Sequence, residues 1–529
     1  MTEENSNRNS SSQDESESTG DTMSEDDAIR GILKSAGVVY TGLFLNMAIA
    51  FVAQRFAAVH LSISGFGSLL SGTALLDIGA VIAGLGLSSG LTRYLPRIDK
   101  GAKRSLVVYT FIFVLPISVT ISVPVVLFAD RIAMVVFSDP NITVSLQIFA
   151  ATIPFAAVLN LAIGGIRGQK VSRFRVYIKD ILHPSVRFGL IMIAVVIGAD
   201  QVGFAAGYAI PYIVGAFISI ALLWRVLPSE VGTSLQRDIL SDVVRYSLPF
   251  TITGLTSFVY RSIDIFLILY LIDSRAVGMY GVAYAFSQMI GTFSTAFSYL
   301  STPVSSQLEN DDRVDEAVAV QETIARWIII ATIAALVPMV LFASEYLQLI
   351  YRPAYGEAGL VLVILAIGFA VKNVLQTHGP ILEALGKSKL SAFNTTTAAI
   401  VNLAVNLTLI PVYGITGAAV ATTFSFVVLS ILPTIEVWYF TGVTSLSRRV
   451  LAPVFVAIPL SIVGFPVFQM VPGTLVWVLT ASASFAIIYM IAIVVVLGFT
   501  QEDVMIVRSI EDKYGIPLGP LDTVLRRYS

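Results

Sequence analysis

The chain has 529 residues, of which 56% are hydrophobic and 13% are charged, with a formal net charge of −2 and a mean hydropathy of +0.81. This composition excludes an ordinary soluble domain, and the charge balance does not indicate nucleic acid as a partner. The absence of cysteine excludes disulfides and thiolate metal sites. Charged residues gather in short clusters between long apolar runs, which predicts a protein that crosses a membrane many times.

The N-terminal stretch 1–28 is polar, acidic and rich in serine. It has too few apolar side chains to form a core, so we expect a disordered tail. The stretch has neither a basic start nor an apolar run, and its pattern does not predict a signal peptide.

Apolar runs of spanning length follow this tail. A helix needs about 20 mostly apolar residues to cross ~30 Å of hydrocarbon. Fourteen segments meet this condition: 36–57, 64–90, 105–128, 144–165, 177–198, 202–226, 244–272, 277–303, 325–348, 357–381, 391–411, 415–439, 450–470 and 474–498. The expected fold class is therefore an all-α polytopic membrane protein with about 14 transmembrane helices.

Basic residues indicate the side of the membrane on which each loop lies, because Lys and Arg accumulate on the cytoplasmic side. The N-terminal tail, every second loop after it and the C-terminal tail, counted with the adjoining span ends, hold 26 of the 33 basic residues. The opposite side holds four, namely Arg55, Arg131, Arg275 and Arg352. This alternation supports the span count and predicts a multi-pass protein of the cell membrane with both termini in the cytoplasm.

Segments of the first half recur in the second half at a nearly constant offset. "LFADRIAMVVF" at 127–137 resembles "LFASEYLQLIY" at 341–351, and a weaker match relates Gly67 to Gly278. Both halves begin inside, so we expect parallel repeats that form two six-helix lobes around a central cavity. The predicted domains are the tail at 1–28, an N-lobe at 29–226, a linker at 227–243, a C-lobe at 244–440, two further helices at 441–499 and a cytoplasmic tail at 500–529.

Five charged residues lie inside predicted spans and more than four residues from either end: Arg187, Arg261, Lys372, Asp77 and Asp264. A charge at the bilayer centre costs at least ~2.5–3.5 kcal/mol, so these side chains should face protein or water. Arg261 and Asp264 are three residues apart on one helix and share a face. One interpretation is that this pair neutralises itself and fixes helix packing. Alternatively, Asp264 and Asp77 hold protons or sodium ions that are coupled to transport.

The cations favour a functional interpretation for two reasons. Arg187 and Lys372 have no acidic residue within a turn of their own helices. The repeat offset takes Arg187 to about Asn402 and Arg261 to about Met47, and neither counterpart is charged. Charge that is asymmetric in a repeated scaffold indicates a substrate requirement. A phosphate or pyrophosphate suits three such cations, which we therefore expect to bind a lipid phosphate.

Amide side chains within the spans are candidate partners for sugars: Asn46, Gln54, Asn160, Asn373 and Gln376. Alternatively, they hold neighbouring helices together. The three histidines, His60, His183 and His378, lie on separate spans or span ends without a ligand spacing. No metal and no cofactor are predicted.

Three segments resemble recurrent sequences of one transporter family. They are "GLGLSSGLTRYLP" at 84–96, "SIDIFLILYLIDSRAVGMYGVAY" at 262–284 and "NLTLIPVYGITGAAVAT" at 406–422. They are similar to polysaccharide-type flippases of the multidrug/oligosaccharidyl-lipid/polysaccharide exporter superfamily, and the resemblance extends over nearly all of residues 30–500. It implies two lobes of six helices, often with two more, and alternating access. It also implies that cavity cations meet a lipid (pyro)phosphate and that Asp264 occupies the place of an aspartate common in span seven.

The expected function is therefore transport. We expect a flippase that moves a polyprenyl- or dolichyl-(pyro)phosphate-linked oligosaccharide or polysaccharide repeat unit from the cytoplasmic to the outer leaflet. Its expected partners are the lipid-linked glycan, membrane lipids, H⁺ or Na⁺ as a coupling ion, and enzymes of glycan synthesis or transfer.

Three alternatives accompany this expectation. A cation-coupled multidrug exporter of the same superfamily would favour an acidic, aromatic pocket, whereas cations outnumber anions in these spans. A membrane glycosyltransferase or ligase would need a sizeable loop with paired carboxylates or histidine, and the predicted outer loops are short, so no enzyme is expected. A scaffold for a synthesis complex would leave the intramembrane cations unexplained.

Overall fold

A computed structural model of the chain describes residues 46–228, 237–291, 314–375, 382, 386–442 and 447–498. All regular elements in these ranges are helices. After an initial helix at 46–60, the long elements are α2 (Ile63–Gly84), α3 (Leu87–Tyr94), α4 (Lys100–Leu127), α6 (Thr143–Gly168), α8 (His183–Val196), α9 (Gln201–Val226), α10 (Arg237–Leu271), α11 (Ser274–Ser287), α13 (Val314–Leu341), α14 (Ala343–Ile350), α15 (Gly359–Leu375), α17 (Ser388–Thr441), α18 (Arg448–Gln469) and α19 (Leu475–Leu497).

The predicted membrane-spanning fold class is confirmed. Within the described ranges, nine helices are long and apolar enough to cross a membrane, or ten if the pair α13–α14, bent by 82°, is one span. Every predicted span overlaps a helix of the described part. The total of fourteen and the cytoplasmic position of both termini stay predictions, because 1–45 and 499–529 lie outside the described residues. The domain boundaries also stay predictions.

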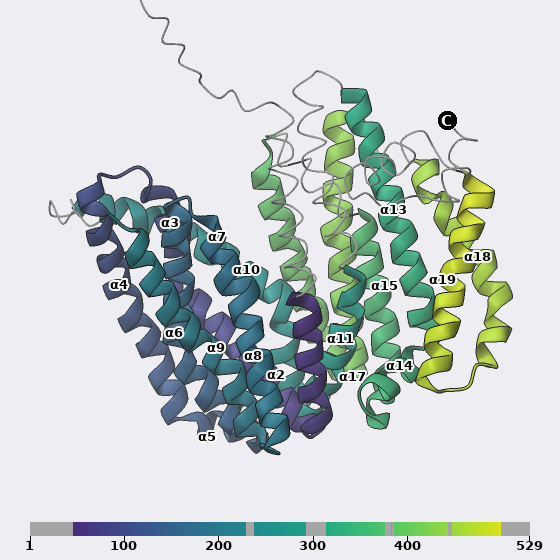
Figure 1. Ribbon diagram of the computed structural model, residues 1–529, viewed down its shortest axis with the longest axis horizontal. Coiled ribbons are helices and arrows are strands. Elements are labelled where there is room, and N and C mark those ends of the chain that lie inside the picture. The colour runs from purple at the N-terminus through teal and green to yellow at the C-terminus, as the bar shows by residue number, and fades with distance from the viewer. Residues whose placement is uncertain are drawn as a thin grey trace, which may run out of the picture.

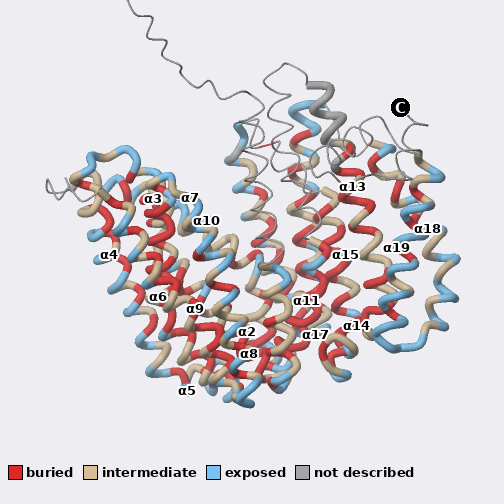
Figure 2. Tube along the Cα trace, viewed as in Figure 1, coloured by how far each residue is buried: buried red, intermediate tan, exposed pale blue. Residues whose placement is uncertain are grey.

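Large apolar side chains cover the outward faces of the peripheral helices, where pale blue marks exposure in Figure 2. A soluble protein rarely exposes such a continuous apolar surface, whereas hydrocarbon accepts it without cost. Examples on α4 and α18 are Ile112, Phe113, Val119, Phe455, Ile462 and Val463.

The helices form two bundles (Figure 1). In the first, α6 packs against α2, α4 and α9. In the second, α15 packs against α11, α13 and α17, and the last two helices, α18 and α19, lie against α13. Helix α10 joins the bundles, because it contacts both α2 and α17. Residues from both bundles can therefore meet along α2, α10 and α11.

The repeat seen in the sequence is also present in the helix ends. Helices α4 and α13 both have 28 residues, and each ends one residue before a phenylalanine with a distorted backbone, Phe128 or Phe342. The amide of each phenylalanine donates to a proline carbonyl at 2.9 Å, from Phe128 to Pro124 and from Phe342 to Pro338. A short helix then follows in both copies. Equivalent breaks at equivalent positions support two copies of one folding unit.

The two copies touch at repeat-related glycines. A Cβ atom built on Gly67 of α2 would overlap the carbonyl oxygen of Ser274, and one built on Gly278 of α11 would overlap the carbonyl oxygen of Ile63. Each carbonyl lies four residues before the glycine of its own helix, so the contact is reciprocal. This geometry is expected for parallel repeats that are related by a two-fold axis between α2 and α11. Small residues here let the backbones approach closely.

The second predicted span, 64–90, is divided in the structure. Helix α2 ends at Gly84, and both Leu85 and Gly86 have positive φ angles, 44° and 66°. Glycine adopts this conformation without strain, which explains a break inside an apolar run. A side chain at Gly86 would overlap the backbone of Ser247 on α10, so the small residues do permit close helix contact there.

One turn separates the two spans predicted at 391–411 and 415–439. Helix α17 extends through both, but Gly414 has φ 60° and ψ −140°, which are not helical. The backbone of Leu409 lies against Gly417, and Asn402 contacts Ser425. In each pair, the two residues lie at similar distances along the sequence on either side of Gly414. The two halves of α17 therefore run antiparallel as a hairpin.

A carboxylate joins the bundles on the side predicted to be outside. The backbone amide of Ser274, the first residue of α11, donates to Asp139 Oδ2 at 2.9 Å, and Asn141 donates to Oδ1. Burial opposes the charge of Asp139, but the hydrogen bonds from Ser274 and Asn141 outweigh it and lower the pKa of this carboxyl below its ordinary value. Asp139 is therefore charged at neutral pH and stabilises the start of α11 from the other bundle.

Two further hydrogen bonds cross between the bundles on the same side. Arg55 Nε donates to the carbonyl of Ile350 at 2.7 Å, and the Tyr355 hydroxyl donates to the carbonyl of Ala58 at 3.2 Å. These contacts connect the helix at 46–60 with the region around α14. The bundles are thus in direct polar contact at their outer ends.

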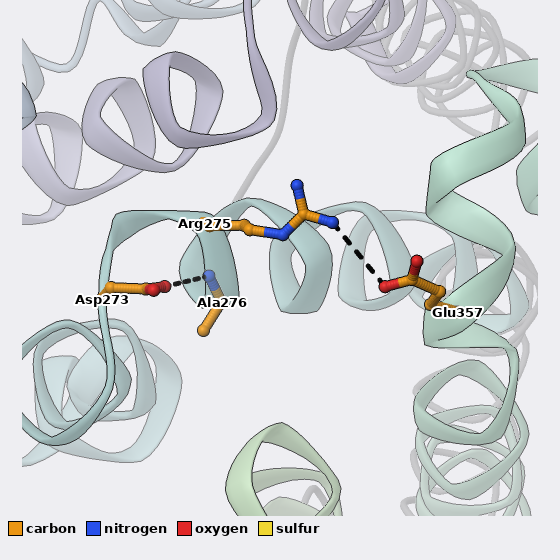
Figure 3. Close-up of polar contacts among 4 residues, drawn as sticks. All are labelled: Asp273, Arg275, Ala276 and Glu357. Carbon is orange, nitrogen blue, oxygen red and sulfur yellow. Dashed lines mark hydrogen bonds and ion pairs between the residues drawn. The ribbon is translucent and has the colours of Figure 1, made fainter.

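Figure 3 shows two contacts around the start of α11. Asp273 accepts a hydrogen bond from the Ala276 amide at 2.7 Å and caps the helix. Arg275 forms an ion pair with Glu357 at 3.7 Å. Both charged side chains are largely exposed, so the ion pair contributes little to stability.

Candidate functional site

Arg261 and Asp264 share helix α10 but point into different surroundings. Arg261 is exposed, and its Nε donates to the Ser257 carbonyl at 3.3 Å. Asp264 is only 2% exposed. The one ion pair within 4.0 Å in the described part of the chain is that between Arg275 and Glu357. The structure therefore does not bring Arg261 and Asp264 together as a neutralising pair.

Asp264 is instead surrounded by neutral hydrogen-bond donors. Its Oδ2 accepts from the Tyr280 hydroxyl at 2.7 Å and from the Thr422 hydroxyl, while Oδ1 accepts from Asn406 Nδ2 at 2.7 Å. Asn406 Nδ2 also lies within reach of the Asn402 carbonyl and of Asn402 Oδ1, at 2.9 and 3.1 Å. We call these five residues the Asp264 cluster. All five are buried, in α10, α11 and α17.

The Asp264 cluster forms a layer in the outer half of the predicted bilayer. Asn406 and Thr422 each lie eight residues from Gly414, and Asp264 lies eight residues before Ile272, which directly follows α10. Eight residues of helix place the layer ~12 Å below the outer turns. Asn406 Oδ1 is buried and accepts no hydrogen bond. An orphan acceptor beside a carboxylate favours occupation by a proton or a small cation.

Asp77 on α2 lies among cations. Its side chain is exposed, and the charges of Arg261, Lys179 and Arg187 all act on its carboxylate. These three cations come from both bundles, because Arg261 lies on α10 whereas Lys179 and Arg187 precede α9. None of them approaches a carboxylate within 4.0 Å in the described ranges. The arrangement retains an excess of positive charge that is available to a ligand.

Arg187 is held by aromatic and histidine side chains rather than by an acid. Its guanidinium lies 5.2 Å from the centre of the Tyr208 ring, and Nη2 is 3.5 Å from His183 Nδ1. The His183 ring packs edge-on against Tyr212, with ring centres 4.5 Å apart. Cation–π contact stabilises a guanidinium and leaves its N–H groups available for an anion.

Lys372 on α15 is likewise surrounded by rings. Its Nζ lies 4.8 Å from the Phe426 ring centre, 5.4 Å from that of Tyr260 and 5.9 Å from that of Phe369. The nearby charge that acts on it is that of Arg261. Two cations of the second bundle therefore lie close to each other, which favours a divalent or extended anion between them.

Helix geometry places two of the predicted phosphate ligands at similar depth. Arg261 precedes the end of α10 by ten residues, and Arg187 precedes the end of α8 by nine. At 1.5 Å per residue both lie ~15 Å from the outer helix ends, which is the middle of a hydrocarbon core ~30 Å thick. A charge at this depth is stable only beside water, protein or ligand.

The predicted sugar-facing amides have different surroundings. Asn373 is buried and donates to the Ile290 carbonyl at 2.6 Å, a bond between helices. Asn46, Gln54 and Asn160 are half-buried. Gln376 lies outside the described residues.

Sequence reasoning missed two groups of functional candidates. The first is the set of partners of Asp264, although Tyr280, Asn406 and Thr422 all lie in the segments that carry the family resemblance. The detectable signal was two asparagines one turn apart on a span, Asn402 and Asn406. The second group is Lys179 and His183, which precede Arg187 on the same span at intervals of four residues.

Residues 32–309 match the family described as polysaccharide biosynthesis protein, and residues 249–408 match the MatE family. A similar protein is the probable low-salt glycan biosynthesis flippase Agl15 of Haloferax volcanii. It is 25% identical over 406 residues, which make up 76% of this chain and 82% of that protein.

Solved structures of two transporters have a similar fold. The lipid II flippase MurJ in an inward closed conformation has a TM-score of 0.72 at 11% identity, over 87% of this chain and 98% of that chain. An inward-facing multidrug resistance MATE family transporter of the MOP superfamily has a TM-score of 0.59 at 16% identity, over 74% of this chain and 93% of that chain. At such identities the likeness concerns the fold alone.

Proposed function

The chain belongs to the polysaccharide biosynthesis protein family, and on that premise we propose that it is a flippase for a lipid-linked glycan. It moves a polyprenyl- or dolichyl-(pyro)phosphate-linked oligosaccharide, or a polysaccharide repeat unit, from the cytoplasmic to the outer leaflet. The observation that carries the proposal is the set of intramembrane cations Arg187, Arg261 and Lys372, none of which pairs with a carboxylate within the described ranges. They come from both bundles and suit one phosphate or pyrophosphate.

The lipid tail of such a substrate can stay among the apolar helices while the head group crosses. An apolar groove of about 470 Å³ opens between α18 and α19. It adjoins the second bundle, because Phe468 on its wall packs against Phe342 beside α14, with ring centres 5.7 Å apart. Among its lining residues are Leu460, Val467, Trp477, Ala481 and Ile488. A hydrocarbon chain gains free energy in such a groove in proportion to the apolar area that it covers.

The Asp264 cluster supports coupling to a proton or a sodium ion. It supplies carboxylate, amide and hydroxyl oxygens, which are the ligands that hard cations prefer. The orphan Asn406 Oδ1 adds an acceptor that a cation satisfies. Asp77 is the alternative coupling residue, but its neighbouring cations compete with an inorganic cation for its carboxylate.

Alternating access requires the outer contacts to break. The hydrogen bonds from Arg55, Tyr355 and Ser274 to their partners close the outer ends of the two bundles. In this conformation we expect the substrate head group to enter from the cytoplasmic side. Rocking of one bundle against the other, with separation of these outer contacts, then exposes the same cations outward.

The decisive experiment is transport by the purified chain in proteoliposomes. A fluorescent polyprenyl-diphosphate-linked oligosaccharide is incorporated, and its accessibility to a membrane-impermeant quencher is followed over time. We expect the wild-type chain to accelerate flipping, and Arg261→Met, Arg187→Met and Lys372→Met each to slow it at least tenfold. Lys100→Met, at the exposed start of α4, is the matched control and should flip at the wild-type rate. Equal rates with and without protein would refute the proposal.

The match of residues 249–408 to the MatE family favours a second candidate, a cation-coupled multidrug exporter. That activity needs an acidic pocket for cationic drugs, whereas three exposed or half-buried cations face one exposed carboxylate, Asp77, in the described cavity-facing spans. Drug susceptibility of cells that lack the gene separates the two functions. Loss of surface glycan without a change in drug tolerance supports the flippase, and the reverse result supports the exporter.

The remaining parts of the proposal concern location and partners. We place the protein in the cell membrane with both termini in the cytoplasm, as a transporter without catalytic activity that acts between enzymes of glycan synthesis and transfer. A cysteine introduced at Asn141, which is exposed in the predicted outer loop, should react with an impermeant thiol reagent in intact cells. A cysteine at Ser105 should not, and the chain has no native cysteine to interfere.

A further inference from the structure

Four basic side chains occur at intervals of four residues along the fifth predicted span: Arg175, Lys179, His183 and Arg187. They begin in the cytoplasmic loop and end at mid-membrane depth, ~18 Å apart along the helix axis. Lys179 acts electrostatically on Arg175 at one end and on Asp77 at the other. We call this set the basic ladder.

The local helix type keeps the basic ladder on one face. A step of four residues in an α-helix overshoots a full turn by about 40°, so a long series would rotate away. Here the segment Val176–Leu182 is a π-helix, whose wider turns offset this drift. The upper half then continues as α8 from His183. The side chains of the basic ladder consequently face α2 and α9. Lys179 interacts electrostatically with Asp77 of α2, and His183 packs on Tyr212 of α9.

The hydrogen bonds of His183 determine its tautomer. A guanidinium can only donate, so the contact of 3.5 Å from Arg187 Nη2 makes Nδ1 of His183 the acceptor. The ring proton is then on Nε2. That Nε2–H is buried without an acceptor, and so is Nε–H of Arg187. His183 is 91% buried, because only 9% of its surface is exposed.

Two adjacent orphan donors indicate an absent acceptor. Buried N–H groups are nearly always paired, and leaving one unpaired costs ~1–3 kcal/mol. Water or a carboxylate would meet this need in a purely structural site, yet no carboxylate lies within 4.0 Å of Lys179 or Arg187 in the described ranges. An anion with several oxygens can accept from more than one donor, and its charge is attracted by the ammonium group of Lys179.

We propose that the basic ladder is a binding track for the phosphate groups of the substrate, with Lys179 and His183 as ligands besides Arg187. This inference rests on the proposed flippase function and adds to it the route by which the head group enters. The phosphate first meets Arg175 and Lys179 near the cytoplasmic surface. It then moves one helical turn at a time to His183 and Arg187, where Arg261 of the other bundle completes its coordination.

The test measures binding of farnesyl diphosphate, a short isoprenoid diphosphate, to the full chain in nanodiscs by calorimetry, with farnesol as the uncharged control. Hydrogen bonds to a charged group correspond to at least about a tenfold change in affinity. We therefore expect Lys179→Met and His183→Leu each to weaken binding about tenfold or more. Lys100→Met, which removes an exposed lysine far from the ladder, should bind as the wild type does.

A second variant separates ligand contact from packing. Glutamine places an amide N–H near the position of His183 Nε2 but has no ring. His183→Gln should recover most of the affinity that His183→Leu loses, whereas a purely structural role would leave both variants equally weak. With His60→Gln and His378→Gln the chain has one histidine, so its ¹⁵N spectrum reports the tautomer directly. We expect the Nε2–H form, with a shift of its resonance when farnesyl diphosphate binds.

The outcomes distinguish the track from the proposed function. If the wild type binds farnesyl diphosphate and Arg261→Met weakens binding while the Lys179 and His183 variants do not, the track is refuted and the flippase proposal stands. If the wild type binds farnesyl diphosphate no better than farnesol, both proposals are refuted. A loss of affinity in the Lys179 and His183 variants together with rescue by glutamine supports the track.

Discussion

Two intramembrane aspartates of this chain have opposite surroundings. Asp264 is 2% exposed and is satisfied by hydroxyl and amide donors, with no ion pair. Asp77 is exposed and lies among Lys179, Arg187 and Arg261. The residue type is the same, but the first site surrounds a carboxylate with neutral hydrogen-bond donors, whereas the second places a carboxylate among cations.

The difference suggests that the two aspartate sites have different roles. A carboxylate whose hydrogen-bond partners are all uncharged is suited to a proton or a small cation, because no positively charged partner is paired with it. A cation-rich surface with one weakly competing carboxylate is suited to an anion. Under the proposed function, the cations around Asp77 bind the substrate phosphate together with Lys372 of α15, and the Asp264 cluster on α10, α11 and α17 is the candidate site for a coupling ion.

The largest expected effect on stability comes from removing the carboxylate of Asp264. Asp264→Ala leaves the donors of Tyr280, Thr422 and Asn406 buried without their acceptor, and we expect a loss of about 3 kcal/mol in the free energy of unfolding. Asp77→Ala at an exposed position should change it by no more than ~0.5 kcal/mol. Thermal unfolding of the two purified variants gives the comparison. Equal destabilisation would show that the two environments do not differ as described.

A smaller change tests whether the Asp264 cluster holds sodium. Thr422→Val keeps the shape of the side chain and removes its hydroxyl, at an expected cost of ~1 kcal/mol. Sodium should raise the unfolding temperature of the wild type and of Asp77→Asn, because a ligand that binds the native state stabilises it. Thr422→Val should lose most of that increase. If sodium stabilises Thr422→Val and the wild type equally, its binding site lies elsewhere.

A double-mutant cycle sharpens the separation of Arg261 from Asp264. Because the two side chains form no ion pair, the effects of Arg261→Met and Asp264→Leu on unfolding should add to within ~0.5 kcal/mol. The double variant should fold no better than Asp264→Leu alone, and it should not flip substrate. A coupling energy of several kcal/mol would restore the interpretation of the pair as a structural clasp.

The smallest effect concerns a third carboxylate, Asp139, which joins the bundles outside the spans. Its folded-state pKa is lowered, so its contribution is complete above the ordinary carboxyl pKa of about 4 and is lost as the pH falls through the lower folded value. Labelling of a cysteine at the buried position Val277 should therefore be slow and constant from pH 7 to pH 5. Asp139→Asn should increase labelling at pH 7. Increased labelling of the parent at pH 5 would contradict this account.

Sequence periodicity predicted the helices well because a bilayer demands a long apolar run for each crossing. It predicted α4, α9 and α19 to within a few residues at most ends. It missed the break after Gly84, since a positive φ inside an apolar run has no hydropathy signal. It also placed Arg261 and Asp264 on one face, whereas Arg261 is exposed and Asp264 is buried, and it could not reveal that Tyr280 and Thr422 donate hydrogen bonds to the carboxylate.

The candidate site was only half predictable for the same reason. Arg187, Arg261 and Lys372 stand out in a sequence because charge is rare in spans. The partners of Asp264 do not, because asparagine, threonine and tyrosine occur on many membrane helices as packing residues. Their role follows from the hairpin at Gly414 and from its packing on α10 and α11, and these are tertiary features.

The reciprocal contact of Gly67 and Gly278 has a consequence for how such a molecule diverges. After an internal duplication, each copy is free to change independently wherever its side chains meet only its own bundle. At the contact between Gly67 and Gly278, each copy packs directly against the backbone of the other copy. A larger side chain in one cannot be offset by a smaller one in the other, because the opposing atoms are backbone. This contact should therefore be the last trace of the ancestral symmetry to disappear.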